Sequence, residues 1–582
     1  METTGRVLAP TGSRENERRP VKENINKLLI YLLILSALVR IAWWDWRVAV
    51  IENEGAEYAR IAQNLRLGNG YVGTMVGPEL VDPPLFPVFI VAASYLTGNN
   101  YERAARTVTL AAGLVLVAAT FLLARRLYGT QVAAIAGLLV SLSPILIAAS
   151  VQACADGVYT SMVILGLYLG LRAVEQFTPI QFGVVGIVFG LAYLTRAEGF
   201  LYPFGIAAAA LVISRLRRIS IRRVATCCAV MFLSFAPVAA PYIYFLQRHT
   251  GHLRIEGKSE MNFQLSEKVS SGEPPEQAAW GINDKLQEEG VMLNPNAVLQ
   301  SPSRQWTSRQ KLKVLVRNAL RNAQLIFVLR DFSRTGFPIL LVLAYAGICW
   351  TPWTRTRALR EIYMLLMFPL VLSSVLLGGW LQFRYIYASL VVALIWSAKG
   401  TDALAEKAAG AWSQTLLAKK VAVRWTAIAT VALVLLLTGV SARKLEEFNS
   451  AHPSHIGLKQ AGLWLDAYKP GPKTVMDSGT VVSFYGDGVW VPMPYADPAL
   501  TLRYIEKKQP EFVVVNGLSY AWVYPAGKQW LQSGISDARA KLVYKSGHTP
   551  FDSILIYEWW NQSGVRADLQ NSVRKPVPDK NW

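Results

Sequence analysis

The sequence has little cysteine and little charge for its length. Its 582 residues include four cysteines, Cys154, Cys227, Cys228 and Cys349, and no two of them form a CxxC pair. A disulfide scaffold or a structural zinc site is therefore not expected. Charged residues make up 17% of the chain, whereas soluble domains carry roughly a quarter. This composition argues against a soluble protein.

The common signatures of soluble enzyme classes are missing as well. No P-loop or nucleophile elbow occurs in the sequence. His249 and His252, in HTGH, are too few for a metal site. The net charge is +20, but the basic residues flank apolar runs and do not form one stripe with interleaved aromatic residues. Nucleic acid is therefore not expected as a partner.

What the sequence does contain is long apolar runs. Hydrophobic residues make up 52% of the chain, and the mean hydropathy is +0.28. Many runs have the length of about twenty residues that crosses a hydrocarbon core about 30 Å thick, which predicts a polytopic α-helical membrane protein with about eleven transmembrane helices. The predicted spans are 27–44, 104–124, 130–150, 157–173, 178–195, 200–214, 224–246, 337–351, 361–379, 385–400 and 424–441.

One short apolar run, residues 83–98, decides the orientation of every later span. It starts with two prolines and is too short to cross comfortably, so we predict a helix that lies in the outer interface. The basic groups at 125–126, 215–223 and 354–360 then share one side with the basic N-terminus, as the positive-inside rule requires. We predict a cytoplasmic N-terminus, a first span retained as a signal-anchor, and an extracytoplasmic C-terminus.

The predicted organisation has three parts. Residues 1–26 form a basic cytoplasmic tail, and residues 27–442 form the membrane domain, with outer loops at 47–102 and 247–335 that include amphipathic helices. Residues 443–582 alternate short β-rich runs with helical runs, which indicates a small extracytoplasmic α/β domain. The predicted strands are KTVMDS, VVSFYG, EFVVVNG, KLVYKSG and SILIYEWW.

Acidic residues gather at the predicted outer face. From Glu54 the chain reads as an amphipathic helix, with Asn53 as its N-cap and Tyr58 on its apolar face. Glu54 and Glu57 would lie near its N-terminus, where the helix dipole favours acids, so a purely structural role stays open. Asp156 lies at the outer end of another span, where it could be a simple interfacial acid. Two acids that converge on one cleft would equally suit acid–base chemistry.

Several cations are predicted on the same face. Arg196 shares an outer turn with Glu198. Lys258 lies on the long outer loop, and Arg384 precedes Tyr385 at the start of a span. A local ion pair, a solvated lysine and interfacial snorkelling are the simple explanations. Cations around two acids would also suit a phosphate-bearing substrate, because arginine grips phosphate in a bidentate way.

Several segments occur in the order that is typical of one family. The most specific is EGAEYARIAQNLRLGNGY followed by DPPLFP; YERAARTVTLAAG, SLSP, the acid at Asp156, AYLTRAEGFL, GHLRIEGKSEMNF and QFRYIYASL then follow. These segments resemble the C-type glycosyltransferase superfamily, in the branch that contains protein O-mannosyltransferases and aminoarabinose–lipid A transferases. The resemblance covers most of the membrane region and implies the C-type glycosyltransferase (GT-C) fold.

The resemblance also implies a reaction. The donor would be a polyprenyl-phosphate-linked sugar, and an acceptor hydroxyl of a protein or glycolipid would attack the sugar C1 with inversion. Glu54 matches the position of the first-loop catalytic carboxylate, which is usually aspartate in the family, and Asp156 matches the second outer-loop acid. Further substrate-binding residues implied by the resemblance are Glu57, Tyr58, Arg196, Lys258, Arg384 and Tyr385, of which the last two form the late RY motif associated with the donor phosphate.

Other functions stay open at this point. A transporter or flippase of a lipid-linked substrate would place ionisable residues near the midplane in related halves, but the candidate charges here lie at the outer ends of spans. A non-catalytic scaffold would tolerate replacement of Glu54 or Asp156. No cofactor is firmly implied, although two carboxylates could hold a divalent metal ion. The predicted setting is the plasma (inner) membrane, and the lipid bilayer is itself a partner.

Overall fold

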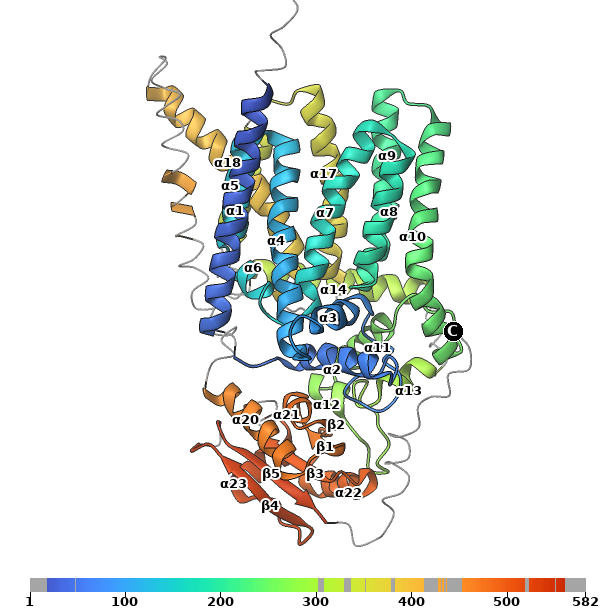
Figure 1. Ribbon diagram of the computed structural model, residues 1–582. Coiled ribbons are helices and arrows are strands. Elements are labelled where there is room, and N and C mark those ends of the chain that lie inside the picture. The colour runs from blue at the N-terminus through green and yellow to red at the C-terminus, as the bar shows by residue number, and fades with distance from the viewer. Residues whose placement is uncertain are drawn as a thin grey trace, which may run out of the picture.

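The computed structural model describes most of the chain. The described residues are 18–47, 49–301, 308–328, 337–350, 352–377, 383–412, 453–518, 523–549 and 551–560, with a few more between 428 and 436. This part is mostly helical, with a small five-stranded sheet near the C-terminus (Figure 1). Most of the predicted tail 1–26 and most of the predicted span 424–441 lie outside the described residues.

Long apolar helices form an upright bundle (Figure 1), as expected for an integral membrane protein. Within the described residues, six helices are long and apolar enough to cross a membrane. They belong to α1 (Arg18–Arg47), α4 (Tyr101–Tyr128), α7 (Ala155–Gln176), α9 (Tyr202–Arg217), α10 (Ile221–Thr250) and α18 (Tyr387–Trp412). Shorter helices of the bundle are α5 (Thr130–Leu142), α8 (Pro179–Tyr193) and α16 (Phe337–Cys349), and the longer α17 (Arg355–Leu377) contains Pro369. Each predicted span up to residue 400, except 130–150, coincides with a single helix, which confirms the polytopic helical fold.

Two elements depart from a simple set of spans. The single span predicted at 130–150 is wrong, because α5 ends at Leu142 and a separate helix, α6 (Pro144–Ala149), follows it. Pro144 lacks an N–H to continue the hydrogen-bond ladder and favours an extended residue before it, and Ser143 is indeed extended. The run after Pro83-Pro84 forms α3 (Leu85–Ser94), whose ten residues span only about 15 Å. A helix of that length cannot cross a bilayer by itself.

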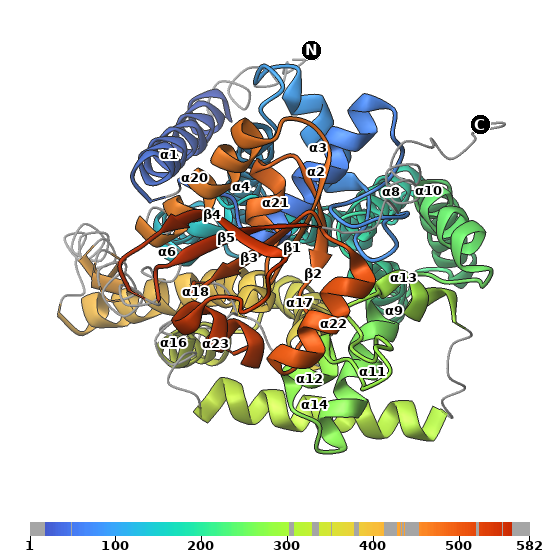
Figure 2. The same cartoon turned by 90° about the horizontal axis from the view of Figure 1, so that it is seen from below.

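Short helices collect between the bundle and the C-terminal sheet (Figure 1). They are α2 (Asn53–Leu67), α3, the 3₁₀ turns η1 (Ala197–Leu201) and η2 (Phe383–Ile386), α11 (Lys258–Ser270), α12 (Pro275–Trp280), α13 (Pro295–Gln300) and α14 (Ser308–Val328). Helix α14 lies crosswise to the bundle helices in Figure 1 and runs along the edge of the bundle in Figure 2. It exposes Leu312, Val316 and Leu320. An exposed apolar face on a basic helix is typical of a segment that lies in the membrane interface.

The C-terminal part is a small α/β domain, as predicted. Its elements are α20 (Pro453–Tyr468), β1 (Lys473–Asp477), α21 (Val481–Tyr485), β2 (Gly488–Pro492), α22 (Pro498–Lys508), β3 (Phe512–Asn516), α23 (Pro525–Ser533), β4 (Ala540–Ser546) and β5 (Ile554–Trp559). The strand order is β2-β1-β3-β5-β4, with β2, β1 and β3 parallel and the pairs β3–β5 and β4–β5 antiparallel. Its core includes Met476, Val513, Tyr504 and Trp530.

One strand prediction in this domain is wrong. The run VVSFYG, expected to be a strand, forms helix α21, and the strand beside β1 is the following segment, β2. Val481 and Val482 are buried against the core of the domain, so their β-branched side chains fill a helical rather than a pleated surface. Tertiary packing has overridden β propensity here. Seen from below, the sheet lies over the centre of the bundle, while α1, α10 and α14 lie at its periphery (Figure 2).

Candidate active site

A cavity of about 370 Å³ opens at the ends of the membrane helices that face the C-terminal domain. Its lining comes from α2, the residues before α3, the start of α7, η1, α11, α14, α17 and η2. Six of the eight predicted site residues line it, namely Glu54, Tyr58, Asp156, Arg196, Lys258 and Tyr385. Phe200, Leu201, Phe263 and Leu315 supply an apolar part of the same wall. The cavity therefore combines charged groups with a surface that suits a lipid.

Glu54 stands in the first turn of α2 and is paired with two cations. Its carboxylate contacts the Arg384 guanidinium, and its Oε1 lies 3.5 Å from Lys258 Nζ. The side chain is 26% exposed, so it is accessible from the cavity. The helix itself begins one residue earlier than predicted: Glu52 is the N-cap, and Asn53 is the first helical residue. Lys258 and Arg384, which lie more than 200 and about 330 positions after Glu54 in the chain, thus both contact its carboxylate.

Asp156 stands in the first turn of α7 on the opposite side of the Arg384 side chain. Its Oδ1 is paired with Arg196, and its Oδ2 lies 3.5 Å from Arg384 Nη1. Arg196 also pairs with Glu198 at 2.9 Å, as the local ion pair suggested by the sequence requires. Arg384 therefore connects the two predicted catalytic acids, since one guanidinium contacts both Glu54 and Asp156.

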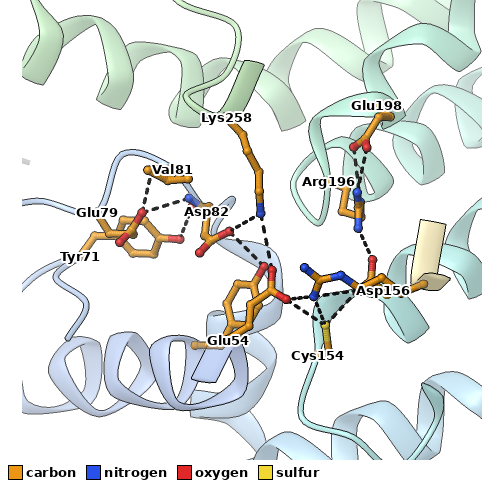
Figure 3. Close-up of polar contacts among 12 residues, drawn as sticks. Glu54, Tyr71, Glu79, Val81, Asp82, Cys154, Asp156, Arg196, Glu198 and Lys258 are labelled. Carbon is orange, nitrogen blue, oxygen red and sulfur yellow. Dashed lines mark hydrogen bonds and ion pairs between the residues drawn. The ribbon is translucent and has the colours of Figure 1, made fainter. Parts of the chain in front are cut away.

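Lys258 links Glu54 to a third acid. Its Nζ lies 3.5 Å from Asp82 Oδ1 as well as 3.5 Å from Glu54 Oε1 (Figure 3). Burial by itself would lower the pKa of the Lys258 ammonium, but the nearby carboxylates, Asp82 above all, outweigh it and raise that pKa. Tyr58 donates a hydrogen bond of 3.2 Å to the same Asp82 oxygen. Lys258 is therefore a fixed positive charge at neutral pH.

Glu57 is placed differently from the other predicted site residues. It accepts hydrogen bonds from the backbone N–H of Thr74, at 2.9 Å, and from the Thr74 hydroxyl, and it does not line the cavity. Burial raises the pKa of Glu57, against the effect of these hydrogen bonds, and burial together with the charge of Glu57 raises the pKa of Glu79 further. Glu57 thus holds the loop at Thr74, and Glu79 accepts hydrogen bonds from the backbone N–H groups of Val81 and Asp82. The contact of Glu57 with a substrate stays a prediction.

Tyr385 completes the cationic side of the cavity. The Arg196 guanidinium lies 4.8 Å from the centre of the Tyr385 ring, and the Arg384 guanidinium lies 5.8 Å from it. Both distances are within the range of a cation–π contact. The ring thus lies between the two arginines and holds their side chains toward the acids.

The fit of a divalent metal ion can be judged from the same atoms. Ligand atoms of Glu54, Cys154 and Asp156 lie within 4.8 Å of one another. Arg384 Nη1 contacts all three, at 3.5 Å from the Cys154 sulfur. Burial first, and then the charge of Asp156, raise the pKa of the Cys154 thiol, so a metal ion would have to displace the thiol proton before the sulfur could bind it. The guanidinium occupies the place of a cation, and the residues do not fit a metal ion beside it.

Two members of this cluster were not singled out in the sequence. Asp82 precedes the two prolines, and a lone acid in an outer loop carries no signal of its own until Lys258 is placed beside it. Cys154 is two residues from Asp156 and 2.9 Å from its Oδ2. The one feature of the sequence that could have identified Cys154 as a site residue is its position two residues before the candidate acid Asp156, at the start of a span.

Comparisons with known proteins agree with this architecture. Residues 81–244 match the family model described as dolichyl-phosphate-mannose-protein mannosyltransferase. The fold is similar to that of ArnT from Cupriavidus metallidurans bound to undecaprenyl phosphate, with a TM-score of 0.53 and 13% sequence identity over 91% of this chain and 97% of that chain. No curated protein sequence matches the chain.

A second group of similar structures comes from an archaeon. The oligosaccharyltransferase of Archaeoglobus fulgidus in its apo form has a TM-score of 0.56 and 13% identity, over 93% of this chain and 75% of that chain. The same enzyme, AglB, in complex with an inhibitory peptide and a dolichol-phosphate also has a TM-score of 0.56, with 13% identity over 94% and 75% of the two chains. The chain therefore has the fold of the C-type glycosyltransferases and carries, over residues 81–244, the sequence pattern of the dolichyl-phosphate-mannose-protein mannosyltransferases.

Proposed function

We propose that the protein transfers a sugar from a polyprenyl-phosphate donor to an acceptor hydroxyl, with inversion at the sugar C1. The observation that carries the proposal is the pair of acids, Glu54 and Asp156, connected through Arg384 in a cavity at the ends of membrane helices. Similar structures contain undecaprenyl phosphate or a dolichol-phosphate. These ligands support a polyprenyl phosphate as the carrier of the sugar.

In the proposed reaction, Glu54 accepts the proton of the acceptor hydroxyl. The hydroxyl oxygen forms a bond to the sugar C1 while the bond from C1 to the phosphate oxygen breaks, and the electron pair leaves with the phosphate. Arg384 and Lys258 stabilise the negative charge that develops on that oxygen. Phosphate is a good leaving group, so a covalent enzyme intermediate is not needed.

The ion pairs suggest how the base becomes active. Arg384 and Lys258 are both paired with Glu54. A donor phosphate would compete for the same two cations, and Glu54 would then lose the positive charges that weaken it as a base. Asp156, held by Arg196, would keep Arg384 oriented and bind the acceptor or the sugar. Donor binding would thus prepare the base for the second substrate.

The same reasoning favours a reaction without a divalent ion. Because Arg384 already supplies the positive charge between Glu54 and Cys154, we expect EDTA to leave turnover unchanged. A loss of activity in EDTA that Mn²⁺ or Mg²⁺ restores would contradict this part of the proposal. A structure of the Archaeoglobus fulgidus oligosaccharyltransferase contains Zn and sulfate. Zn²⁺ should therefore be tested beside Mn²⁺ and Mg²⁺ after EDTA treatment.

We further propose that the site faces the extracytoplasmic side. The arginines of residues 215–223 and 354–360 lie at the bundle ends opposite the C-terminal domain (Figure 1), and such clusters mark cytoplasmic ends. The family pattern makes mannose the first sugar to test and a protein hydroxyl the first acceptor. The orientation can be tested by introducing a cysteine at position 549 in the C-terminal domain or at position 218 between α9 and α10. A thiol reagent that does not cross the membrane should label position 549, and not position 218, in intact cells.

The central experiment measures sugar release from radiolabelled polyprenyl-phosphate mannose, glucose and aminoarabinose by the purified protein in liposomes. We expect turnover of at least one donor by the wild type and a loss of turnover in Glu54→Gln. Glu289→Gln makes the same chemical change at an exposed residue of the long outer loop and should behave as the wild type. Unchanged turnover in Glu54→Gln would overturn the assignment of the base.

A further inference from the structure

A second cavity lies at the far ends of three helices that build the candidate active site. Helices α7 and α17 contribute Asp156 and Ser373 to the active-site cavity at one end, and α9 follows directly on the Phe200-Leu201 wall. Their other ends enclose a cavity of about 250 Å³, at the top of the bundle in Figure 1. It is lined by Leu171, Val174, Glu175, Ile213, Arg217, Thr356, Leu359 and Arg360.

The cavity has an apolar wall and a cationic rim. Leu171, Val174 and Ile213 are buried, and Leu359 is half-buried. Arg217 and Thr356 are exposed at the mouth. An apolar slot that ends in cations at the level of the membrane surface matches a phospholipid, whose acyl chain is apolar and whose headgroup carries a phosphate.

The charges at this end are strongly unbalanced. Glu175 is the one acid in the lining, and it is shared by Arg360, at 2.7 Å, and Arg126. Arg217 donates to the backbone carbonyls of Glu175, at 2.5 Å, and Val174, at 3.3 Å, at the C-terminal end of α7. These contacts hold the guanidinium groups in place. Further exposed arginines lie close to Arg217 and Thr356 in the chain, at positions 215, 218, 222, 223 and 355.

We propose that this cavity binds the headgroup phosphate of an anionic phospholipid from the leaflet opposite the active site. Arg217 and Arg360 would contact the phosphate, Thr356 would donate a hydrogen bond to it, and one acyl chain would lie against Ile213 and Leu359. The inference does not depend on the glycosyltransferase reaction, because the two cavities lie at opposite ends of the helices.

Native mass spectrometry of the delipidated full-length protein tests the proposal. Added phosphatidylglycerol should bind about tenfold more tightly than phosphatidylcholine with the same chains, and the double variant Arg217→Gln/Arg360→Gln should lose that preference. A double change of exposed arginines at the other end of the bundle, Arg103→Gln/Arg248→Gln, is the control and should keep it.

Because Arg217 also binds the end of α7, its replacement could disturb folding. Thr356→Trp keeps every arginine and fills the mouth of the cavity, so it should also weaken phosphatidylglycerol binding. Equal binding of the two lipids, or unchanged preference in both variants, would overturn the proposal. Displacement of phosphatidylglycerol by inorganic phosphate at equal concentration would overturn it too, since the lipid chain would then contribute nothing.

A different set of contacts supports a second inference, which rests on the proposed function. The C-terminal domain binds the start of α2, directly before Glu54. The backbone N–H of Thr480 donates to Asn53 Oδ1 at 2.9 Å, and the Thr480 hydroxyl donates to the Asn53 carbonyl at 2.8 Å. The predicted role of Asn53 as a helix cap is therefore replaced by a contact with another domain.

Neighbouring contacts extend this attachment along the chain. The backbone N–H of Ile51 donates to the Tyr485 hydroxyl at 3.2 Å. Further along α2, the buried Arg60 pairs with Asp487 at 2.7 Å and donates to the Phe484 carbonyl at 3.1 Å. The turn and helix around α21 thus hold both the entry and the first turns of the helix that carries Glu54.

We infer that Thr480 is a positioning residue for Glu54. The N-cap Glu52 makes no side-chain hydrogen bond to the helix, whereas Thr480 makes two hydrogen bonds to Asn53, the residue directly before Glu54. A carboxylate that shifts by about 1 Å can lose a hundredfold in rate without losing its charge. The C-terminal domain would therefore act as part of the active-site framework.

Steady-state kinetics of Thr480→Val, Thr480→Ser and Thr549→Val test this role. Thr480→Val should lower kcat about tenfold with the donor KM unchanged, and Thr480→Ser should restore it because the hydroxyl returns. Thr549→Val makes the same change at an exposed position of the same domain and should have no effect. An active wild type with unaffected Thr480→Val would overturn the inference, whereas an inactive wild type would instead refute the proposed function.

Discussion

Replacement of Glu54 by glutamine should separate catalysis from donor binding. Glutamine keeps the size of the side chain but cannot accept the acceptor proton, so kcat should fall by about 10²- to 10⁴-fold. Binding of the lipid phosphate should change in the opposite direction. Arg384 and Lys258 are both paired with Glu54, and the variant would release both cations for the phosphate.

The size of that second effect follows from the exposure of the pairs. The side chains of Glu54, Arg384 and Lys258 are 26%, 24% and 37% exposed, so solvent screens their attraction. A pair of this kind contributes up to about 1 kcal/mol, which corresponds to a factor of about five in affinity for each pair lost. We expect undecaprenyl phosphate to bind the variant at least as tightly as the wild type, and up to about fivefold tighter per released cation.

Two measurements on the same protein preparations check this reasoning. Isothermal titration calorimetry gives the dissociation constant of undecaprenyl phosphate, and the rate of sugar release from the saturating donor gives kcat. Arg384→Gln should weaken undecaprenyl phosphate binding about tenfold, because a charge-assisted hydrogen bond is lost. Weaker binding of undecaprenyl phosphate by Glu54→Gln than by the wild type would refute the idea that Glu54 and the phosphate compete for the same cations.

Three further perturbations have defined outcomes. Asp156→Asn breaks the pair with Arg196, which keeps its second partner Glu198, and should destabilise the protein by about 1.5 to 3 kcal/mol, seen as a lower Tm in differential scanning fluorimetry. Lys258→Met should raise the donor KM about tenfold, whereas Lys268→Met on the same helix should leave it unchanged, and equal effects of the two would argue against phosphate binding by Lys258. Burial raises the pKa of Asp477 from 3.8 to about 7. The folded state therefore keeps a proton that the unfolded state releases. As the pH rises from about 4 to 7, the Tm of the wild type should fall relative to the Tm of Asp477→Asn. A Tm difference between the two proteins that does not change with pH would contradict this assignment.

Much of the fold could be predicted because its causes are local. The length and hydropathy of each run determine whether it can cross a bilayer, and the run after Pro83-Pro84, predicted not to cross, forms a helix of only ten residues. The strand VVSFYG could not be assigned correctly from propensity, because its conformation as α21 follows from packing against the C-terminal core. Local preference decides an element only where no distant contact outweighs it.

The residues of the candidate site divide in the same way. The motif resemblance identified Glu54, Asp156 and Arg384 by position, and the sequence alone determined that all three lie near one membrane face. Only the tertiary structure decided that Arg384 contacts both acids and that Lys258 pairs with Asp82. These contacts join residues from separate helices. An ion pair between residues that are far apart in the sequence produces no repeating pattern from which it could be predicted.

What the sequence by itself determined is thus most of the apolar helices before residue 400 and the likeness to a glycosyltransferase branch, whereas the side of the membrane that carries the acids stays a prediction. The attachment of the C-terminal domain to Asn53 and the second cavity around Arg217 were decided by the tertiary structure. The physical reason is that hydrophobic periodicity and proline act within a few residues of the chain. Ion pairs, caps and cavities depend on which surfaces the packed helices bring together.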